Sequence, residues 1–178
     1  LKQQARRLKK ESGVSHHEAL DLVAKSVGFD HWHHVSESAK AFAPTEFAYY
    51  FGVLIAMDLK DGMEFRDETG QFVEDQLAFA FCTNDIYQYV SEEEEENGEI
   101  DTNDPTYQED LQEWVSDMSM NYMVFRFTGT IIPSTVDEVM TLVRKCSFWP
   151  AQFIWHKGVF QDSPNDLALD DNGDVVGL

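Results

Sequence analysis

Residues 15–34 read SHHEALDLVAKSVGFDHWHH, and their pattern predicts a short helix with a defined beginning and end. Ser15 followed by Glu18 is the pattern of a capping box, in which each side chain accepts a hydrogen bond from the other residue's backbone N–H. Apolar residues then recur at helical spacing. Gly28 is the expected left-handed stop, with Phe29 packing behind it.

Two further helices are predicted on either side of this one. Residues 1–12 show the helical period and end at Gly13. Asp30 is the predicted cap of a third helix, which is expected to end at Pro44 because proline disfavours a continuing helix. Three short helices around one small core predict a separate module over residues 1–43.

This module resembles the helical segment of glyoxalase-related proteins and of uncharacterised bacterial, plasmid and phage proteins. In these, an A-x-x-L helix leads to S-H-x-x-A-L-x-x-x-A and then to G-F-x-x-W. The matching residues are Ala5, Leu8, Ser15, His16, Ala19, Leu20, Ala24, Gly28, Phe29 and Trp32. The resemblance covers residues 1–40 and implies three helices and a bacterial or mobile-element source. It does not imply glyoxalase chemistry, because residues 44–178 show neither the paired βαβββ units nor the metal-binding His/Glu set of that superfamily.

Residues 44–178 are predicted to form a mixed α/β body. The expected helices lie at 45–62, at 85–90, at 106–118 and after Ser134 or Thr135, either of which can cap the last one. The expected strands are a hairpin around Thr69 and Gly70 within 63–75, then 76–83, 121–132 and 151–160. Helices and strands mix without a strict βαβ order, so the predicted class is α+β with a small, largely antiparallel sheet.

Charge divides the chain unevenly, with a net charge of −20 overall. Residues 1–40 carry seven Lys and Arg against five Asp and Glu, whereas residues 41–178 carry six against 28. An acidic loop is expected at 91–104 and a polar tail at 161–178. A body this acidic repels nucleic acid and anionic membranes, and it favours basic partners or simply keeps the protein in solution.

Membrane insertion and secretion are not expected. The longest apolar run, residues 47–57, is shorter than the roughly 20 residues of a membrane-spanning helix, so it predicts a buried core helix. No signal-peptide pattern opens the chain. Cys82 and Cys146 are expected to be free thiols, and the predicted location is cytoplasmic.

Histidines near the start of the chain raise the question of a metal site. His17 and Asp21 share a helix face at i,i+4, and His156 follows the last strand. Glu18, on the same helix, is already explained by the capping box. Capping and surface positions therefore account for the histidines, and we expect no bound metal or cofactor. The sequence also lacks nucleophile-elbow, dinucleotide-binding and phosphate-binding loop motifs.

Nucleic-acid contact, if any, is expected through the first helix. Its basic residues are Lys2, Arg6, Arg7, Lys9 and Lys10. The third helix, HWHHVSESAK, lacks the Arg, Asn or Gln that usually read base edges. Any binding is therefore predicted to be weak and non-specific.

Three hypotheses of function follow from these patterns. The leading one is a non-enzymatic interaction or regulatory protein of bacterial or mobile-element type, whose acidic body binds a partner protein with a basic surface. One alternative is a metal-dependent enzyme related to glyoxalase-like proteins. The other is an inhibitor that mimics nucleic acid and blocks a basic host protein.

Overall fold

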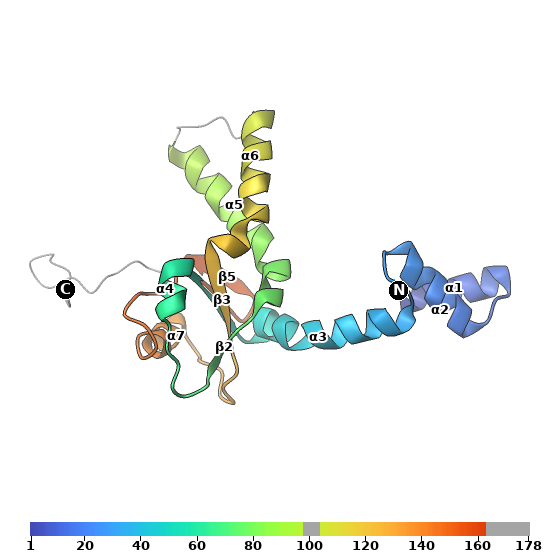
Figure 1. The fold of residues 1–178 in the computed structure, drawn as a ribbon, viewed down its shortest axis with the longest axis horizontal. Helices are drawn as coiled ribbons and strands as arrows, with labels where there is room; N and C mark the ends of the chain where they lie inside the picture. The colour runs from blue at the N-terminus through green and yellow to red at the C-terminus, as the bar shows by residue number, and fades with distance from the viewer. Residues whose placement is uncertain (98–103, 163–178) are drawn as a thin grey trace, which may run out of the picture. The chain divides into compact units, whose positions relative to one another are not determined.

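The protein has an α+β fold in the computed structural model, which describes residues 1–97 and 104–162 (Figure 1). The chain divides into two compact units, Leu1–Pro44 and Thr45–Leu178. The described helices are α1 (Lys2–Ser12), α2 (His16–Ser26), α3 (Trp32–Phe51), α4 (Leu59–Glu64), α5 (Phe79–Asn97), α6 (Pro105–Ser116) and α7 (Val136–Val143), with the single-turn helices η1 (Gln76–Ala78) and η2 (Met118–Met120). The strands are β1 (Val53–Asp58), β2 (Phe72–Glu74), β3 (Tyr122–Phe127), β4 (Phe153–His156) and β5 (Val159–Asp162). The predicted fold class is confirmed.

The first two helices form a small core, in which Ala5, Ala19 and Val23 are buried. The start of α2 follows the predicted cap. The Ser15 hydroxyl oxygen accepts a hydrogen bond from the Glu18 N–H, with 3.1 Å between oxygen and nitrogen. One side-chain oxygen thus satisfies a backbone donor that the helix itself leaves unpaired.

The end of α2 also follows the prediction. Gly28 has a φ of +87°, in the left-handed region that favours glycine. Its N–H donates to the Lys25 carbonyl at 3.2 Å, and the Phe29 N–H donates to the Ala24 carbonyl at 3.0 Å. These two bonds close the helix in the manner of a Schellman motif.

The start of α3 differs from the prediction, because Asp30 is not its cap. The helix begins at Trp32, so His31 occupies the capping position, and its ring Nδ1 accepts from the His34 N–H at 3.1 Å. A second acceptor comes from the preceding helix, since the Asp21 carboxylate accepts from the Trp32 N–H at 2.9 Å. Asp30 lies one residue too early for this role.

The expected end of the third helix at Pro44 is wrong, because α3 continues through it to Phe51. Proline removes one backbone donor and strains the helix interior, by about 3 kcal/mol. Packing offsets this loss in the turns that follow, where Thr45 and Ala48 are buried in the body.

The apolar run at residues 47–57 is not one buried helix. It contains the end of α3, then Gly52, then β1. A Cβ on Gly52 would lie 2.9 Å from the Ala48 Cα, so this change from helix to strand needs glycine. β1 is covered on both faces, and such a strand has a continuous apolar run that periodicity cannot distinguish from a buried helix.

The sheet has five strands in the order β2-β3-β1-β4-β5, and every neighbouring pair is antiparallel. β1 lies at its centre, where Ile55 pairs with Phe125 on one side and Ile154 on the other. The predicted small antiparallel sheet is therefore present.

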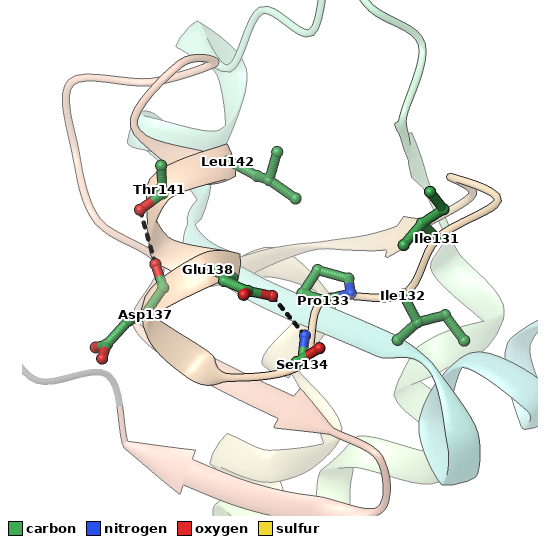
Figure 2. Close-up of a pocket in the computed structure, with 8 residues that line it drawn as sticks. All are labelled: Ile131, Ile132, Pro133, Ser134, Asp137, Glu138, Thr141 and Leu142. Carbon is green, nitrogen blue, oxygen red and sulfur yellow. Dashed lines mark hydrogen bonds between the residues drawn. The ribbon is translucent and has the colours of Figure 1, made fainter.

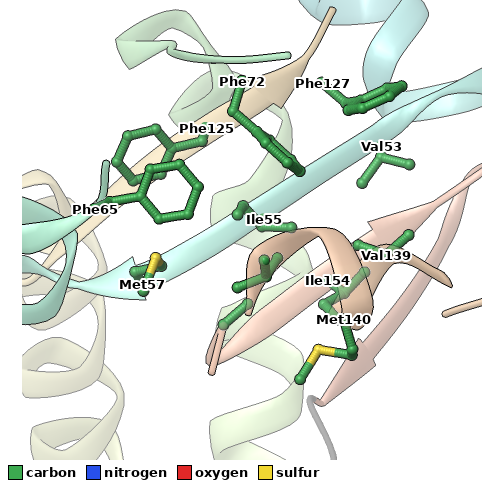
Figure 3. Packing of buried hydrophobic residues seen from close by; sticks show 12 residues of the cluster. Val53, Ile55, Met57, Phe65, Phe72, Phe125, Phe127, Val139, Met140 and Ile154 are labelled. Carbon is green, nitrogen blue, oxygen red and sulfur yellow. The ribbon is translucent and has the colours of Figure 1, made fainter. Parts of the chain in front are cut away.

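Helices cover both faces of this sheet. Alternate residues of β1 point to opposite faces, so the strand contributes apolar side chains to each. Ile55 and Met57 pack with Met140 of α7 on one face, beside several phenylalanines (Figure 3). Leu54 packs with Ile86 of α5 on the other face. The body is thus a layered structure with the sheet in the middle.

The predicted strand at 76–83 is wrong, because these residues form η1 and the first turn of α5. Ala78, Cys82 and Ile86 recur every four residues and are fully buried, which is a helical stripe. The alternating Leu and Phe residues that indicated a strand stand beside this stripe. α5 then continues through Glu92–Glu96, so the first part of the expected acidic loop is helical. Residues 98–103 lie outside the described residues.

Two expectations about strands also need correction. Residues 63–75 contain the end of α4 and a turn at Gly70, but β2 pairs with β3 and not with a neighbour across that turn. Residues 151–160 are not one strand, because β4 and β5 form a hairpin. Its turn residues Lys157 and Gly158 have φ of 53° and 81°, as in a type I′ turn. The tail expected at 161–178 begins with the end of β5, and residues 163–178 lie outside the described residues.

Candidate functional site

The strongest concentration of charge lies on α5 and α6. These helices lie side by side (Figure 1), and the Tyr87 hydroxyl of α5 donates a hydrogen bond to the Gln108 side-chain oxygen of α6. We call their exposed carboxylates, with the residue that precedes α6, the acidic hairpin: Glu92, Glu93, Glu95, Glu96, Asp104, Glu109, Asp110 and Glu113.

The acidic hairpin has no nearby cation in sequence. Residues 67–125 contain 17 Asp and Glu and no Lys, Arg or His. Within the described residues, none of its carboxylates forms an ion pair. Like charges four apart on a helix, such as Glu109 and Glu113, destabilise it by about 0.2–0.5 kcal/mol per pair. Cationic groups of a partner would relieve this repulsion.

Neutral donors hold two of these carboxylates. The Gln88 side-chain amide donates to Glu92 at 2.7 Å, and the Tyr89 hydroxyl donates to Glu93 at 2.6 Å. The same hydroxyl also donates to Asp162 at 3.1 Å. Burial, followed by the bonds donated to Glu93 and Asp162, raises the pKa of Tyr89. The hydroxyl therefore stays protonated and remains a donor.

A polar network anchors α5 to the sheet. The Asp85 carboxylate accepts from the Tyr49 hydroxyl at 2.6 Å and from the Trp155 ring N–H at 2.8 Å. Trp155 is fully buried. Burial, and then the bond to Asp85, raises the pKa of Tyr49. Charge-assisted bonds of this kind fix α5 against α3 and β4.

A second network joins α3, β3 and the segment after β2. The Asp75 carboxylate is 8% exposed, and it accepts from the Thr45 hydroxyl at 2.7 Å and from the Arg126 Nε–H at 2.8 Å. Its other oxygen caps η1 by accepting from the Leu77 N–H at 3.1 Å. Every oxygen of this buried carboxylate is thus paired, which is a structural role.

The cysteines are free, as predicted, but they differ in burial. Cys82 is buried in the core, whereas Cys146 is half-buried. Burial, reinforced by the charge of Asp85, raises the pKa of the Cys82 thiol. A thiol that resists ionisation is a poor nucleophile, so Cys82 is a packing residue.

The candidate metal ligands belong to two different units. His17 Nε2 lies 3.6 Å from Asp21 Oδ2, in the first unit. His156 belongs to the second unit, where its Nε2 lies 2.9 Å from the Pro133 carbonyl oxygen. Across residues 1–97 and 104–162, no group of three or more His, Cys, Asp or Glu is placed to hold a metal ion. The other oxygen of Asp21 already caps α3.

The basic residues of α1 are all exposed. They are Lys2, Arg6, Arg7, Lys9 and Lys10. Arg7 pairs with Glu11 at 2.8 Å, with both side chains largely in solvent. An exposed pair of this kind contributes little and opens readily, so all five cations can reach a polyanion.

A groove of about 530 Å³ lies between α7 and the loop that follows β3 (Figure 2). Ile131 on its rim is 85% exposed. Its polar groups serve the helix: the Glu138 carboxylate accepts from the Ser134 N–H at 2.6 Å, and the Thr141 hydroxyl donates to the Asp137 carbonyl at 2.8 Å. These groups cap and brace α7 rather than converging on the groove.

None of the helices in the described part of the chain combines the length and apolar composition that crossing a bilayer requires. No family model matches the chain, and no curated protein or solved structure matches it either. The resemblance of residues 1–40 to the helical module of glyoxalase-related proteins stays a prediction.

Proposed function

We propose that this chain is a non-enzymatic interaction protein whose body binds a basic partner protein through the acidic hairpin. One observation carries the proposal: the exposed carboxylates of α5 and α6 have no cationic partner within the described residues. Lys and Arg side chains of a partner would supply the missing charge. Such complementarity chiefly accelerates association and selects the partner.

The anchoring of the hairpin supports this role. Hydrogen bonds from Tyr49 and Trp155 to the Asp85 carboxylate fix the N-terminal half of α5 to the body. Trp155 is itself fully buried. A surface held in one geometry loses less conformational entropy when it binds. The engaged polar groups of the groove beside α7 also favour binding over catalysis.

Mimicry of nucleic acid is a second candidate, favoured by the same concentration of carboxylates on two adjacent helices. It differs in the partner, which would be a protein that binds DNA or RNA. Competing DNA would displace such a partner from the acidic hairpin but would leave other basic partners bound.

Affinity capture from a bacterial lysate tests both candidates. The full chain is compared with a variant carrying Glu109→Lys and Glu113→Lys, and with a control carrying Glu46→Lys and Glu68→Lys. All four positions are exposed and both variants change the charge equally. We expect the same basic proteins with the original chain and the control, and their loss with the hairpin variant.

Salt and DNA complete the experiment. Bound proteins should be released at about 1 M salt, where the screening length falls to about 3 Å. Release by double-stranded DNA at low salt would assign mimicry. Recovery of one set of proteins from all three chains would refute the proposal.

A further inference from the structure

Within the described residues, an aromatic surface at the C-terminal end of α3 is left uncovered. Phe51 is 63% exposed, and Phe47, Tyr50 and Val159 are each about half exposed. The ring of Phe51 lies near those of Phe47 and Tyr50, with centroids 5.8 and 6.2 Å apart. We call these four residues the aromatic patch. Large apolar residues that are exposed next to one another mark an interaction site on a protein surface.

The aromatic patch is held in one geometry, because the turn between β4 and β5 is bonded to the end of α3. The Gly158 N–H donates to the Tyr49 carbonyl at 3.0 Å. A Cβ at Gly158 would lie 3.2 Å from the Tyr50 carbonyl oxygen, so the turn packs directly on the helix. Val159 follows this turn and extends the patch. All of these residues belong to the second unit, and a surface fixed in this way loses little conformational entropy on binding.

The charges beside the aromatic patch are balanced, unlike those of the body as a whole. Residues 45–51 and 157–159, which form the patch, contain one acid, Glu46, and one base, Lys157. Both are exposed, and neither forms an ion pair within the described residues. Two bodies with a large negative charge repel each other, so they approach most easily where the local charge is balanced.

The two charges lie toward opposite ends of the patch. Glu46 is one turn before Tyr50 on the same helix face, whereas Lys157 lies beyond the end of the helix, where its N–H donates to the Gly52 carbonyl at 2.8 Å. A two-fold axis through the patch sets two such helix ends antiparallel, so Glu46 of each copy meets Lys157 of the other. A partner of one charge sign would attract one of these residues and repel the other. The patch therefore complements itself.

We propose that two copies of this chain associate through the aromatic patch around a two-fold axis. The aromatic rings of the two copies form the centre of the interface, and a Glu46–Lys157 pair closes each end of it. None of these residues belongs to the acidic hairpin, so the dimer and the function proposed above stand or fall separately.

Sedimentation velocity of the full chain, over a range of concentrations, measures this association. We expect an equilibrium between the chain mass of 20.4 kDa and twice that mass. Raising the salt concentration from about 0.1 M to about 1 M shortens the screening length from about 10 to about 3 Å, so repulsion between the bodies falls and the dimer should tighten about threefold. Capture of a basic partner by the acidic hairpin has the opposite salt dependence. A chain that stays monomeric at both salt concentrations would overturn the proposal.

Two matched variants locate the interface. Phe51→Lys adds a cation in the aromatic patch, and Ile131→Lys adds one at an exposed apolar position on the loop after β3. Phe51→Lys should weaken the dimer at least about tenfold, as the loss of a central aromatic residue does at other interfaces. Ile131→Lys should change it less than about twofold. Equal effects of the two variants would rule out the patch as the interface.

A charge exchange tests the two-fold arrangement. Glu46→Lys sets two cations opposite each other at both ends of the interface, and Lys157→Glu sets two carboxylates there. Each single change should weaken the dimer about fivefold at about 0.1 M salt, and the two changes together should restore it to within about twofold. Because Glu46→Lys lowers the net negative charge, general repulsion alone would make that dimer tighter. A tighter dimer, or a double variant that is not restored, would contradict the arrangement.

The same variants keep the two proposals distinguishable. Glu46→Lys leaves every carboxylate of the acidic hairpin in place, so it remains a control for the capture of basic proteins. Loss of the dimer without loss of captured proteins is the expected result for this change.

Discussion

Replacing Arg126 with Met tests the buried network around Asp75. The Asp75 carboxylate would keep its bonds from Thr45 and Leu77 but would lose its counter-charge. Removing one partner of a buried ion pair costs about 3–5 kcal/mol. The Arg126 side chain is 23% exposed, so water can partly replace it, and we expect the lower value of about 3 kcal/mol.

Urea unfolding followed by tryptophan fluorescence measures this loss, and a melting curve should fall by roughly 6–12 °C. Adding Asp75→Asn to Arg126→Met should recover about 1–2 kcal/mol, because the amide oxygen can accept from the Leu77 N–H and the amide nitrogen can donate to the Thr45 hydroxyl, without a buried charge. Arg144→Met at an exposed position is the control, expected within about 0.5 kcal/mol of the original chain. Equal stability of the two Arg→Met variants would refute this account of the network.

Two further predictions concern α1 and the thiols. We expect a weak gel shift with DNA or RNA, and the double variant Arg6→Glu with Arg7→Glu should abolish it. For five cations, the slope of log affinity against log salt should be no steeper than about −4. A shift that persists in the double variant would place the contact outside α1. Burial, with the nearby Asp67 charge, raises the pKa of the Cys146 thiol, so less thiolate is present at a given pH and its alkylation should be slower than that of free cysteine near pH 8.5. Cys82 should react only after unfolding, and mass spectrometry that finds both thiols alkylated at equal rates in the folded chain would contradict this.

Features that depend on local chemistry were predictable from the sequence. The capping of α2 by Ser15 and its termination at Gly28 involve residues within a few positions of one another. β3 lies within the predicted strand at 121–132, and the aromatic residues of YMVFRF favour a strand wherever it pairs. Thr135, one of two caps left open for α7, accepts from the Glu138 N–H.

Features that depend on distant pairing were not predictable. VLIAM at the centre of β1 is apolar at every position, and its strand conformation is decided by the strands on either side. η1 and the start of α5 were misassigned because Leu77, Phe79 and Phe81 alternate as a strand would. These residues are helical because the neighbouring stripe of Ala78, Cys82 and Ile86 is buried.

The same distinction between nearby and distant residues applies to the candidate sites. The acidic residues were visible as a charge run, but their position on two adjacent helices required the structure. No sequence signal connects Asp75 with Arg126 or Asp85 with Trp155, because each pair joins segments far apart in the chain. Single Asp residues next to apolar segments are too common to indicate a buried network.

The central position of β1 also affects how the protein folds during synthesis. Ile55 pairs with Phe125 and Ile154, so its partners leave the ribosome about 70 and about 100 residues later. At about 5–20 residues per second, β1 waits roughly 5–20 s for its second neighbour. Until β3 emerges, a short apolar segment with high strand propensity has both edges open, and one edge stays open until β4 follows, which is the signature of an aggregation-prone stretch. The body therefore completes its sheet late, and its yield in the cell depends on protection of residues 53–57 until the last strands arrive.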